Sequence, residues 1–272
     1  MTTEAAYDRY AAAYRDWWGP VIAPSAVTLL DRLDGAVPTE RPVRMVDIGA
    51  GTGTLSLAAL ERWPNARVIA VDPSSRILEL AKAAAEDRGL GDRLRTEVGE
   101  AARLPLADTS VDVAVTTFVL QLVPNRAAAV REAFRVLRPG GTFACLTWRA
   151  NEDPFAAASA FEDAAEELDI DLPDRDDWVG RSYSTTAGAA AELRRAGFRS
   201  VRAREQWLEH RFTPRSYVDV LEHWIEDDVF APLDEPMRRR LRNVTLRRLE
   251  KLDAESLVWR RPLVSVAGRR PA

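Results

Sequence analysis

The stretch Val46-Asp47-Ile48-Gly49-Ala50-Gly51-Thr52-Gly53-Thr54 lies between a short apolar run and the helix-forming segment Leu55–Leu60. An apolar strand that leads through an Asp-x-Gly-x-Gly-x-Gly loop into a helix brings bare backbone close to a ligand. Glycine adopts positive φ values and has no Cβ to hold the ligand at a distance. The helix points its unpaired N–H groups and the positive end of its dipole to the same place. This stretch therefore predicts a nucleoside-binding α/β fold.

A second acidic residue narrows the identity of the ligand. Asp72 closes the next apolar run, 21 positions after Gly51, where a doubly wound fold places the carboxylate that accepts hydrogen bonds from ribose. A dinucleotide site needs a G-x-G-x-x-G spacing, but here Thr54 occupies the third glycine position. Asp47 would repel a pyrophosphate and attract an ammonium group. Asp47 and Asp72 together favour S-adenosylmethionine (SAM), which has an amino-acid end and a ribose.

These residues resemble those of the class I SAM-dependent methyltransferases, in particular the small-molecule branch with its quinone and natural-product enzymes. The resemblance covers Val43 to Trp148 well and the rest only by the order of elements. It implies a doubly wound α/β fold with a seven-stranded, mostly parallel sheet, in which strand 7 is antiparallel. Helices on both faces, an N-terminal helical lid and helical insertions complete the expected architecture.

The hydrophobic pattern agrees with alternating strands and helices. Strands are expected at 43–48, 67–71, 93–98, 111–116, 142–148, 199–207 and 257–266. Helices are expected at 54–63, 74–88, 126–137, 186–196, 214–227 and 233–252, with Ser74 as an N-cap and a stop at Pro139-Gly140-Gly141. Residues 4–33 predict one or two helices, broken at Gly19-Pro20 and near Pro24. Residues 151–183 are acidic and predicted irregular.

We expect one methyltransferase domain over 1–272. Within it, residues 1–40 form the lid and 41–150 the SAM-binding core. Residues 151–185 and 208–252 are insertions that cover the substrate, and 253–272 hold the final strand.

The resemblance assigns cofactor-binding roles by position. The loop residues Gly49, Ala50, Gly51 and Gly53 surround the methionine half of SAM, and Asp47 holds its amino group. Asp72, followed by Pro73, binds the ribose. Glu100 stands where relatives carry aspartate, so the adenine contact is assigned to its side chain or to the backbone of Ala101. Thr117 and Phe118 pass the methionine half, and Tyr14 of the lid touches the donor carboxylate. Asp47 as a helix cap and Asp72 as a turn residue are the structural alternatives.

A general base is harder to place. Leu122 stands where many relatives carry histidine, and we interpret it as a packing residue. His210 and His223 are the only histidines, and either could deprotonate a phenol or enol. The lid carries an aromatic stripe, which is either ordinary packing or an apolar wall for the acceptor: Tyr7, Tyr10, Tyr14, Trp17 and Trp18. Further aromatic residues near the insertions predict a roomy, mainly apolar acceptor pocket: Trp148, Phe155, Trp178, Trp207 and Trp224.

Composition excludes several other classes. The net charge of −4 argues against a nucleic-acid partner, and the run of arginines from Arg238 to Arg248 is interpreted as the solvated face of a helix. No apolar run is long enough to span a bilayer, and no signal peptide is evident, so a cytoplasmic location is expected. Cys145, the only cysteine, is expected in a buried strand, and no metal site is predicted. Abundant alanine and scarce lysine suggest a bacterial coding sequence.

These observations lead to an expected function. SAM donates a methyl group to the O, N or C atom of a small, aromatic or polyketide-like metabolite of secondary metabolism, and S-adenosylhomocysteine (SAH) is the product. A quinone or lipid methyltransferase of primary metabolism is one alternative. A SAM-binding protein that does not methylate, such as a binding module or a cyclase, is another. A small-molecule acceptor is the expected partner, and a homodimer is left open.

Overall fold

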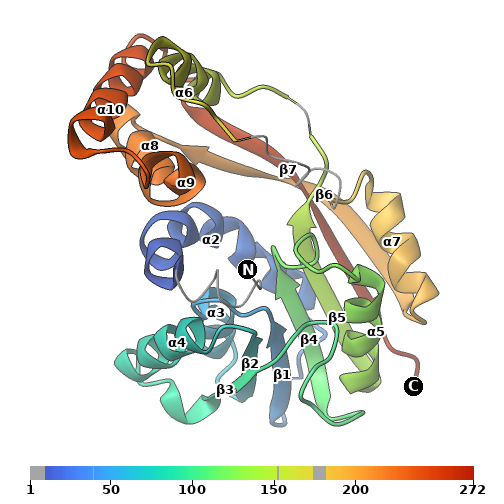
Figure 1. The fold of residues 1–272 in the computed structure, drawn as a ribbon. Coiled ribbons are helices and arrows are strands. Elements are labelled where there is room, and N and C mark those ends of the chain that lie inside the picture. Colours follow the sequence, from blue (N-terminus) through green and yellow to red (C-terminus); the bar gives the residue numbers. More distant parts are fainter. Residues whose placement is uncertain (1–9, 39, 152, 174–181) are drawn as a thin grey trace.

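A seven-stranded sheet in the order β3-β2-β1-β4-β5-β7-β6 forms the centre of the molecule (Figure 1). It is seen in a computed structural model that describes residues 10–38, 40–151, 153–173 and 182–272. The strands are β1 (Val43–Ile48), β2 (Ala66–Asp72), β3 (Leu94–Val98), β4 (Val111–Thr117), β5 (Leu137–Trp148), β6 (Arg199–Arg211) and β7 (Val258–Arg269).

The direction of the strands confirms the predicted fold class. Strands β1 to β5 pair in parallel, and β7 runs antiparallel to both β5 and β6. After β3 the chain crosses over β2 and β1 to place β4 on the other side of β1. Ligands of open α/β sheets bind at the carboxyl ends of the strands at such a switch point, which here lies between β1 and β4.

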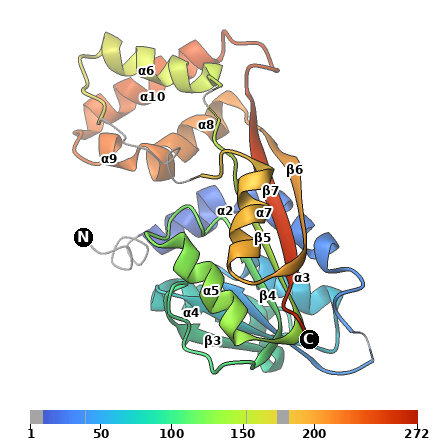
Figure 2. The ribbon, with the colours of Figure 1, turned by 90° about the vertical axis from the view of Figure 1, so that its right-hand side faces the viewer.

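Helices cover both faces of the sheet, and the central strands β1 and β4 are accordingly buried along nearly their whole length. Helix α3 (Thr54–Arg62), α4 (Ser75–Asp87) and the 3₁₀ segment Thr28–Leu33 pack on one face. Helices α5 (Arg126–Val136) and α7 (Thr186–Arg195) pack on the other (Figure 2). Ser74 caps α4 as predicted, because its hydroxyl accepts from the amide of Ile77 at 3.1 Å. Cys145 lies in β5 and is fully buried.

Four further helices form a separate layer, here called the cap. They are α6 (Ala156–Glu167), α8 (Pro214–Val220), α9 (Asp227–Phe230) and α10 (Glu235–Leu249). The cap has its own apolar core, which includes Phe161, Phe230 and Leu241. Figures 1 and 2 show the cap joined to the sheet by the long strands β6 and β7, with α2 (Gly19–Val27) between cap and core.

The predicted break at Gly19-Pro20 is wrong. The N-terminal helix continues from residue 10 to Val27 through a π-helical turn at Tyr14–Trp18, and Pro24 lies inside α2. Pro20 and Pro24 stand four residues apart and are both exposed. The carbonyl groups that lack a donor because of these prolines therefore lie on the solvent side, where water can satisfy them.

The first insertion also differs from its prediction. The segment predicted to be irregular contains α6, whose apolar positions Ala157, Ala160, Phe161 and Ala164 follow helical spacing and pack into the cap. Its acidic residues concealed this pattern. Strand β5 begins at Leu137 instead of Thr142, β6 continues to Arg211 and so crosses the predicted boundary at 208, and β7 reaches Arg269. The predicted helix at 214–227 is divided by a π-helical turn at Leu221–Ile225.

Candidate functional site

The glycine loop lies at the carboxyl end of β1, beside the switch point. Its backbone is held against β2, because the amides of Gly49 and Ala50 donate to the carbonyl of Val71 at 2.7 and 3.0 Å. Gly49, Gly51 and Gly53 have φ values of +70°, +53° and +82°. These left-handed conformations favour glycine. The loop therefore has the shape predicted from its sequence, and α3 begins directly after it at Thr54.

Asp72 lies at the end of β2 next to this loop and is nearly buried. One carboxylate oxygen accepts from the amide of Gly51 at 2.9 Å, and the other accepts from the amide of Ser74 at 3.0 Å, across the half-buried Pro73. The carboxylate thus joins the ends of the two strands that frame a nucleoside site. Asp72 therefore takes part in the turn that follows β2, which is the structural alternative given above. Its carboxylate also lies beside the backbone of the glycine loop, where a ribose would bind.

Asp47 is enclosed more completely than its predicted role suggests. Its side chain is 1% exposed, and the Ser56 hydroxyl donates to its carboxylate at 2.7 Å. Desolvation raises the pKa of Asp47 to about 7, and the nearby charge of Asp72 adds to this rise, while the hydrogen bonds from Ser56 oppose it. An ammonium group brought to this carboxylate would favour its ionised form.

The buried Asp47 predicts a pH dependence of stability. Its carboxyl ionises near pH 4 in the unfolded chain and near 7 in the folded protein. Between these values the folded state holds one more proton, so the free energy of unfolding falls as pH rises. In Asp47→Asn this contribution is absent. We expect the free energy of unfolding of wild type, relative to that of Asp47→Asn, to fall by roughly 3 kcal/mol between pH 5 and pH 8. Urea unfolding of both proteins measures this difference. A difference that is independent of pH would contradict the assigned shift.

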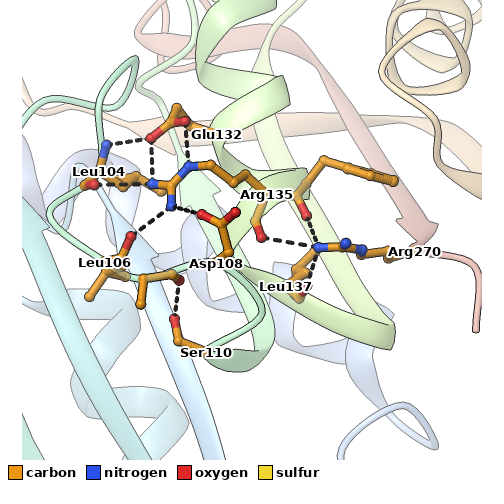
Figure 3. A network of polar contacts seen from close by, with 10 residues as sticks. Leu104, Leu106, Asp108, Ser110, Glu132, Arg135, Leu137 and Arg270 are labelled. Atoms are coloured by element: carbon orange, nitrogen blue, oxygen red, sulfur yellow. Dashed lines mark hydrogen bonds and ion pairs between the residues drawn. The ribbon is translucent and has the colours of Figure 1, made fainter.

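The loop after β3 carries Glu100 and Ala101, the residues assigned to adenine. Helix α5 holds this loop in place (Figure 3). The Arg135 guanidinium donates to the carbonyls of Leu104 and Leu106 at 3.2 and 2.8 Å, and Glu132 accepts from the Leu104 amide at 2.8 Å. The hydrogen bonds from Arg135 lower the pKa of Glu132 and keep it ionised. Glu100 is exposed and Ala101 is half-buried, and their contacts with adenine stay predictions.

Phe118, directly after β4, adopts a strained left-handed conformation with φ of +56° and is buried. Gln121 holds it there, because its side-chain amide donates to the Phe118 carbonyl at 2.7 Å and accepts from the Thr147 hydroxyl at 2.6 Å. Strained backbone of this kind gathers at ligand sites. Gln121 was not predicted as a site residue. A polar residue inside the apolar run 118–123 was the available signal.

Tyr14 of the lid lies over the glycine loop, as predicted. The position that a Cβ on Gly51 would take is 3.5 Å from Tyr14 Cε1 and 3.6 Å from the Tyr14 hydroxyl oxygen. From Tyr14 a continuous series of ring contacts leads back to the end of β4, with centroid separations between 4.6 and 6.4 Å. We call it the aromatic array. Its rings, in order of contact, are Tyr14, Trp224, Trp18, Trp259, Trp148 and Phe118.

Of the other predicted aromatic residues, Tyr10 contacts Trp224 and Trp17 stacks on His223, whereas Phe155 and Trp207 lie elsewhere. Phe155 is buried within the cap against Tyr217, and Trp207 is 53% exposed on the edge strand β6. Neither ring belongs to the aromatic array, and their part in an acceptor pocket stays a prediction. Trp207 is exposed because strand alternation turns its neighbour Leu208 inward. Tyr7 and Trp178 lie outside the described residues.

The two histidines occupy different surroundings. His210 lies on β6 with its ring edge against Phe212 at 4.4 Å, and burial lowers its pKa. His223 stacks on Trp17 at 4.6 Å, and its Nδ1 is 2.8 Å from the carbonyl oxygen of Asp219. Nδ1 must therefore carry the proton, which leaves Nε2 as the acceptor. Among the described residues, no group of three or more His, Cys, Asp or Glu side chains could hold a metal ion.

The arginine-rich segment forms α10, as an amphipathic helix. Arg242 pairs with Asp219 at 2.7 Å and also with Glu222, and Arg248 pairs with Glu167 at 2.8 Å. Arg239 pairs with Glu235 on the helix itself. Much of the basic charge is thus neutralised within the cap. No helix among the described residues has the length and apolar character that crossing a membrane requires.

Comparison with known proteins identifies the domain. Residues 46–145 match the family described as "Methyltransferase domain". The chain is 36% identical over 111 residues to the ubiquinone/menaquinone biosynthesis C-methyltransferase UbiE of Dinoroseobacter shibae, covering 41% of this chain and 44% of the relative. It is 32% identical over 181 residues to the malonyl-(acyl-carrier protein) O-methyltransferase of Methylococcus capsulatus, covering 66% and 58%. The chain thus spans about half the length of these curated relatives.

Solved structures share the fold. YcgJ from Bacillus subtilis superposes with a TM-score of 0.57 at 18% identity, covering 90% of this chain and 98% of that chain. Phosphoethanolamine N-methyltransferase 2 of Haemonchus contortus, solved with phosphomonomethylethanolamine and SAH, superposes with a TM-score of 0.60 at 15% identity, covering 100% and 61%. The family match, the strand order and the glycine loop agree. The chain therefore carries a class I SAM-dependent methyltransferase domain, and SAM is the cofactor of that domain.

Proposed function

We propose that this protein transfers the methyl group of SAM to a small, aromatic or polyketide-like metabolite. The observation that carries this proposal is the aromatic array. Through Tyr14 it adjoins the glycine loop, and at its other end Phe118 closes β4. Flat, apolar acceptors pack well against rings of this kind, and apolar walls with few polar groups are typical of small-molecule sites.

The residues that would hold the donor follow from the site. Positive-φ glycines leave room for a ligand against the loop backbone, Asp72 would accept hydrogen bonds from the ribose, and Asp47 would attract the amino group. When bound, SAM supplies a methyl group activated by a positively charged sulfur. Tyr14 and the array would exclude water and align the acceptor, which are the main demands of an in-line displacement.

A phenol or enol acceptor must also lose a proton. His223 supports this role because, with Nδ1 donating to the Asp219 carbonyl, Nε2 is the nitrogen that can accept in the neutral ring, and His210 supports it because burial lowers its pKa and so favours the neutral ring. An amine or an acidic carbon needs no protein base. We further propose a cytoplasmic, bacterial setting in secondary metabolism. The bacterial relatives support the bacterial part of this proposal.

A quinone acceptor is the second candidate, and the UbiE relative favours it. A quinone ring would pack against the same aromatic array. An activity assay must therefore identify the chemical class of the acceptor. A non-methylating SAM-binding protein is the third possibility from the sequence, and the same assay separates it.

We expect label from methyl-labelled SAM to appear in at least one member of a panel of phenols, polyketides, quinones and amines, read as a mass gain of one methyl group. Asp72→Ala is the negative control, because this variant should bind SAM much more weakly. Retained SAH binding without label transfer to any compound would contradict methyl transfer and favour the binding module. Transfer to quinones alone would select the quinone alternative.

A further inference from the structure

Two π-helical turns face one another where the lid meets the cap. One is Tyr14–Trp18 in the lid, and the other is Leu221–Ile225 between α8 and α9. Each is closed by a hydrogen bond to the fifth preceding residue: Gly19 N–H donates to the Tyr14 carbonyl and Glu226 N–H to that of Leu221. The two turns are in contact. Such turns are rare within helices and concentrate at functional sites.

The cap turn presents two neighbouring rings to the lid. Trp224 contacts Tyr10 and Tyr14 edge to face, with centroids 6.3 and 5.4 Å apart, and lies nearly parallel to Trp18 at 6.4 Å. His223 stacks on Trp17 at 4.6 Å. Tyr10, Tyr14 and Trp18 recur every four residues, so they share one face of the helix. Trp224 occupies the centre of that face.

Tyr14 then carries this contact to the cofactor loop. Its hydroxyl and ring edge lie next to Gly51, whose amide is bound by Asp72. Edge-to-face packing restrains a ring more than undirected apolar contact does. Trp224 therefore packs against the Tyr14 ring from the cap side.

We propose that Trp224 is a positioning residue, which holds Tyr14 over the glycine loop and so makes the cap part of the donor site. It acts through Tyr14 and not by its own contact with the donor. Trp224 and the cofactor loop are separated by more than 150 positions in the chain, and the contact between the Tyr14 and Trp224 rings connects them. The proposal depends on SAM binding and is independent of whether the protein methylates.

Calorimetric titration with SAH tests the proposal. We expect Trp224→Ala to weaken SAH binding about tenfold, and Trp224→Phe, which keeps a ring, to remain within about threefold of wild type. The double variant Tyr14→Ala/Trp224→Ala should bind no more weakly than Tyr14→Ala alone, because the two residues act as one unit. Trp207→Ala is the matched control, since that tryptophan is exposed on β6. It should bind SAH as wild type does.

Thermal melting of each apoprotein separates positioning from folding. If Trp224→Ala melts at a lower temperature than wild type, Trp224→Leu takes its place, because leucine keeps much of the apolar volume. The same single and double variants with Tyr14→Ala are then compared. Wild-type affinity in a folded Trp224 variant, or additive effects with Tyr14→Ala, would overturn the proposal. Failure of wild type itself to bind SAH would overturn the cofactor assignment and this proposal with it. SAH binding without methyl transfer would leave it intact and refute only the proposed function.

Discussion

Replacement of Asp72 by alanine should weaken the binding of SAM and SAH by about a hundredfold. The carboxylate lies at the end of β2 beside the glycine loop, where a ribose would donate two hydrogen bonds to it. Hydrogen bonds to a charged group contribute about 1.5–3 kcal/mol each, and about 1.4 kcal/mol corresponds to a tenfold change in affinity. The measurement is calorimetry with both ligands at one ionic strength.

The same substitution also removes contacts within the protein, so a matched control is needed. Asp72 accepts from the amides of Gly51 and Ser74. Asp112, which is equally buried, accepts from the amide of Arg44 at 2.9 Å, but it lies near the start of β4, away from the carboxyl ends. Asp112→Ala should lower the melting temperature by a similar amount and leave SAH affinity unchanged. Equal loss of affinity in both variants would show that Asp72 acts through stability alone.

The core of the fold could be predicted because its signals are local. β1 was predicted with its observed bounds, since four of its six residues are apolar and all four are buried. The glycine spacing and the carboxylate of Asp72 lie within a short segment, so their proximity in space follows from one strand–helix–strand unit. The strand at 257–266 was predicted from its own residues, but its antiparallel direction came from the family resemblance. The structure confirms it.

The parts that could not be predicted depend on contacts between distant segments. No pattern near Leu221 indicates a π-helical turn, and Trp224 acquires its role only from the lid, which lies at the other end of the chain. Gln121 likewise becomes recognisable when Thr147 from β5 donates to it. Helix α6 was missed because its apolar face belongs to the cap, whose other members follow much later in the sequence.

The roles of Asp47 and the histidines stay predictions for a related reason. The sequence placed Asp47 beside the donor, and the structure adds the Ser56 hydrogen bond and a pKa of about 7. A buried acid with such a pKa releases a proton when a cation arrives, because the cation favours the ionised carboxylate. The role of Asp47 therefore depends on the bound ligand, and the amino-acid sequence alone does not specify that ligand.

Gly49→Ala should be the most disruptive single-methyl substitution in the loop. A Cβ at this position would overlap Val119 Cγ2 and lie 2.9 Å from Cγ1 and 3.1 Å from Cβ of the same residue. The φ of +70° adds the strain of a left-handed alanine. Overpacking costs about 1–3 kcal/mol and the left-handed conformation about 1–2 kcal/mol. We expect a loss of about 3 kcal/mol in the free energy of unfolding, measured with urea.

Gly140→Ala separates the two causes. Gly140 has a φ of +77°, close to that of Gly49, but nothing lies within 4 Å of the Cβ it would carry. Its substitution should therefore cost about 1 kcal/mol and leave SAH binding unchanged. The additional loss in the free energy of unfolding of Gly49→Ala then measures the contact with Val119. SAH binding should weaken as well, because Val119 immediately follows Phe118. Equal costs in the two variants would mean that the loop moves away from Val119 freely, and that the glycine is required only for its φ.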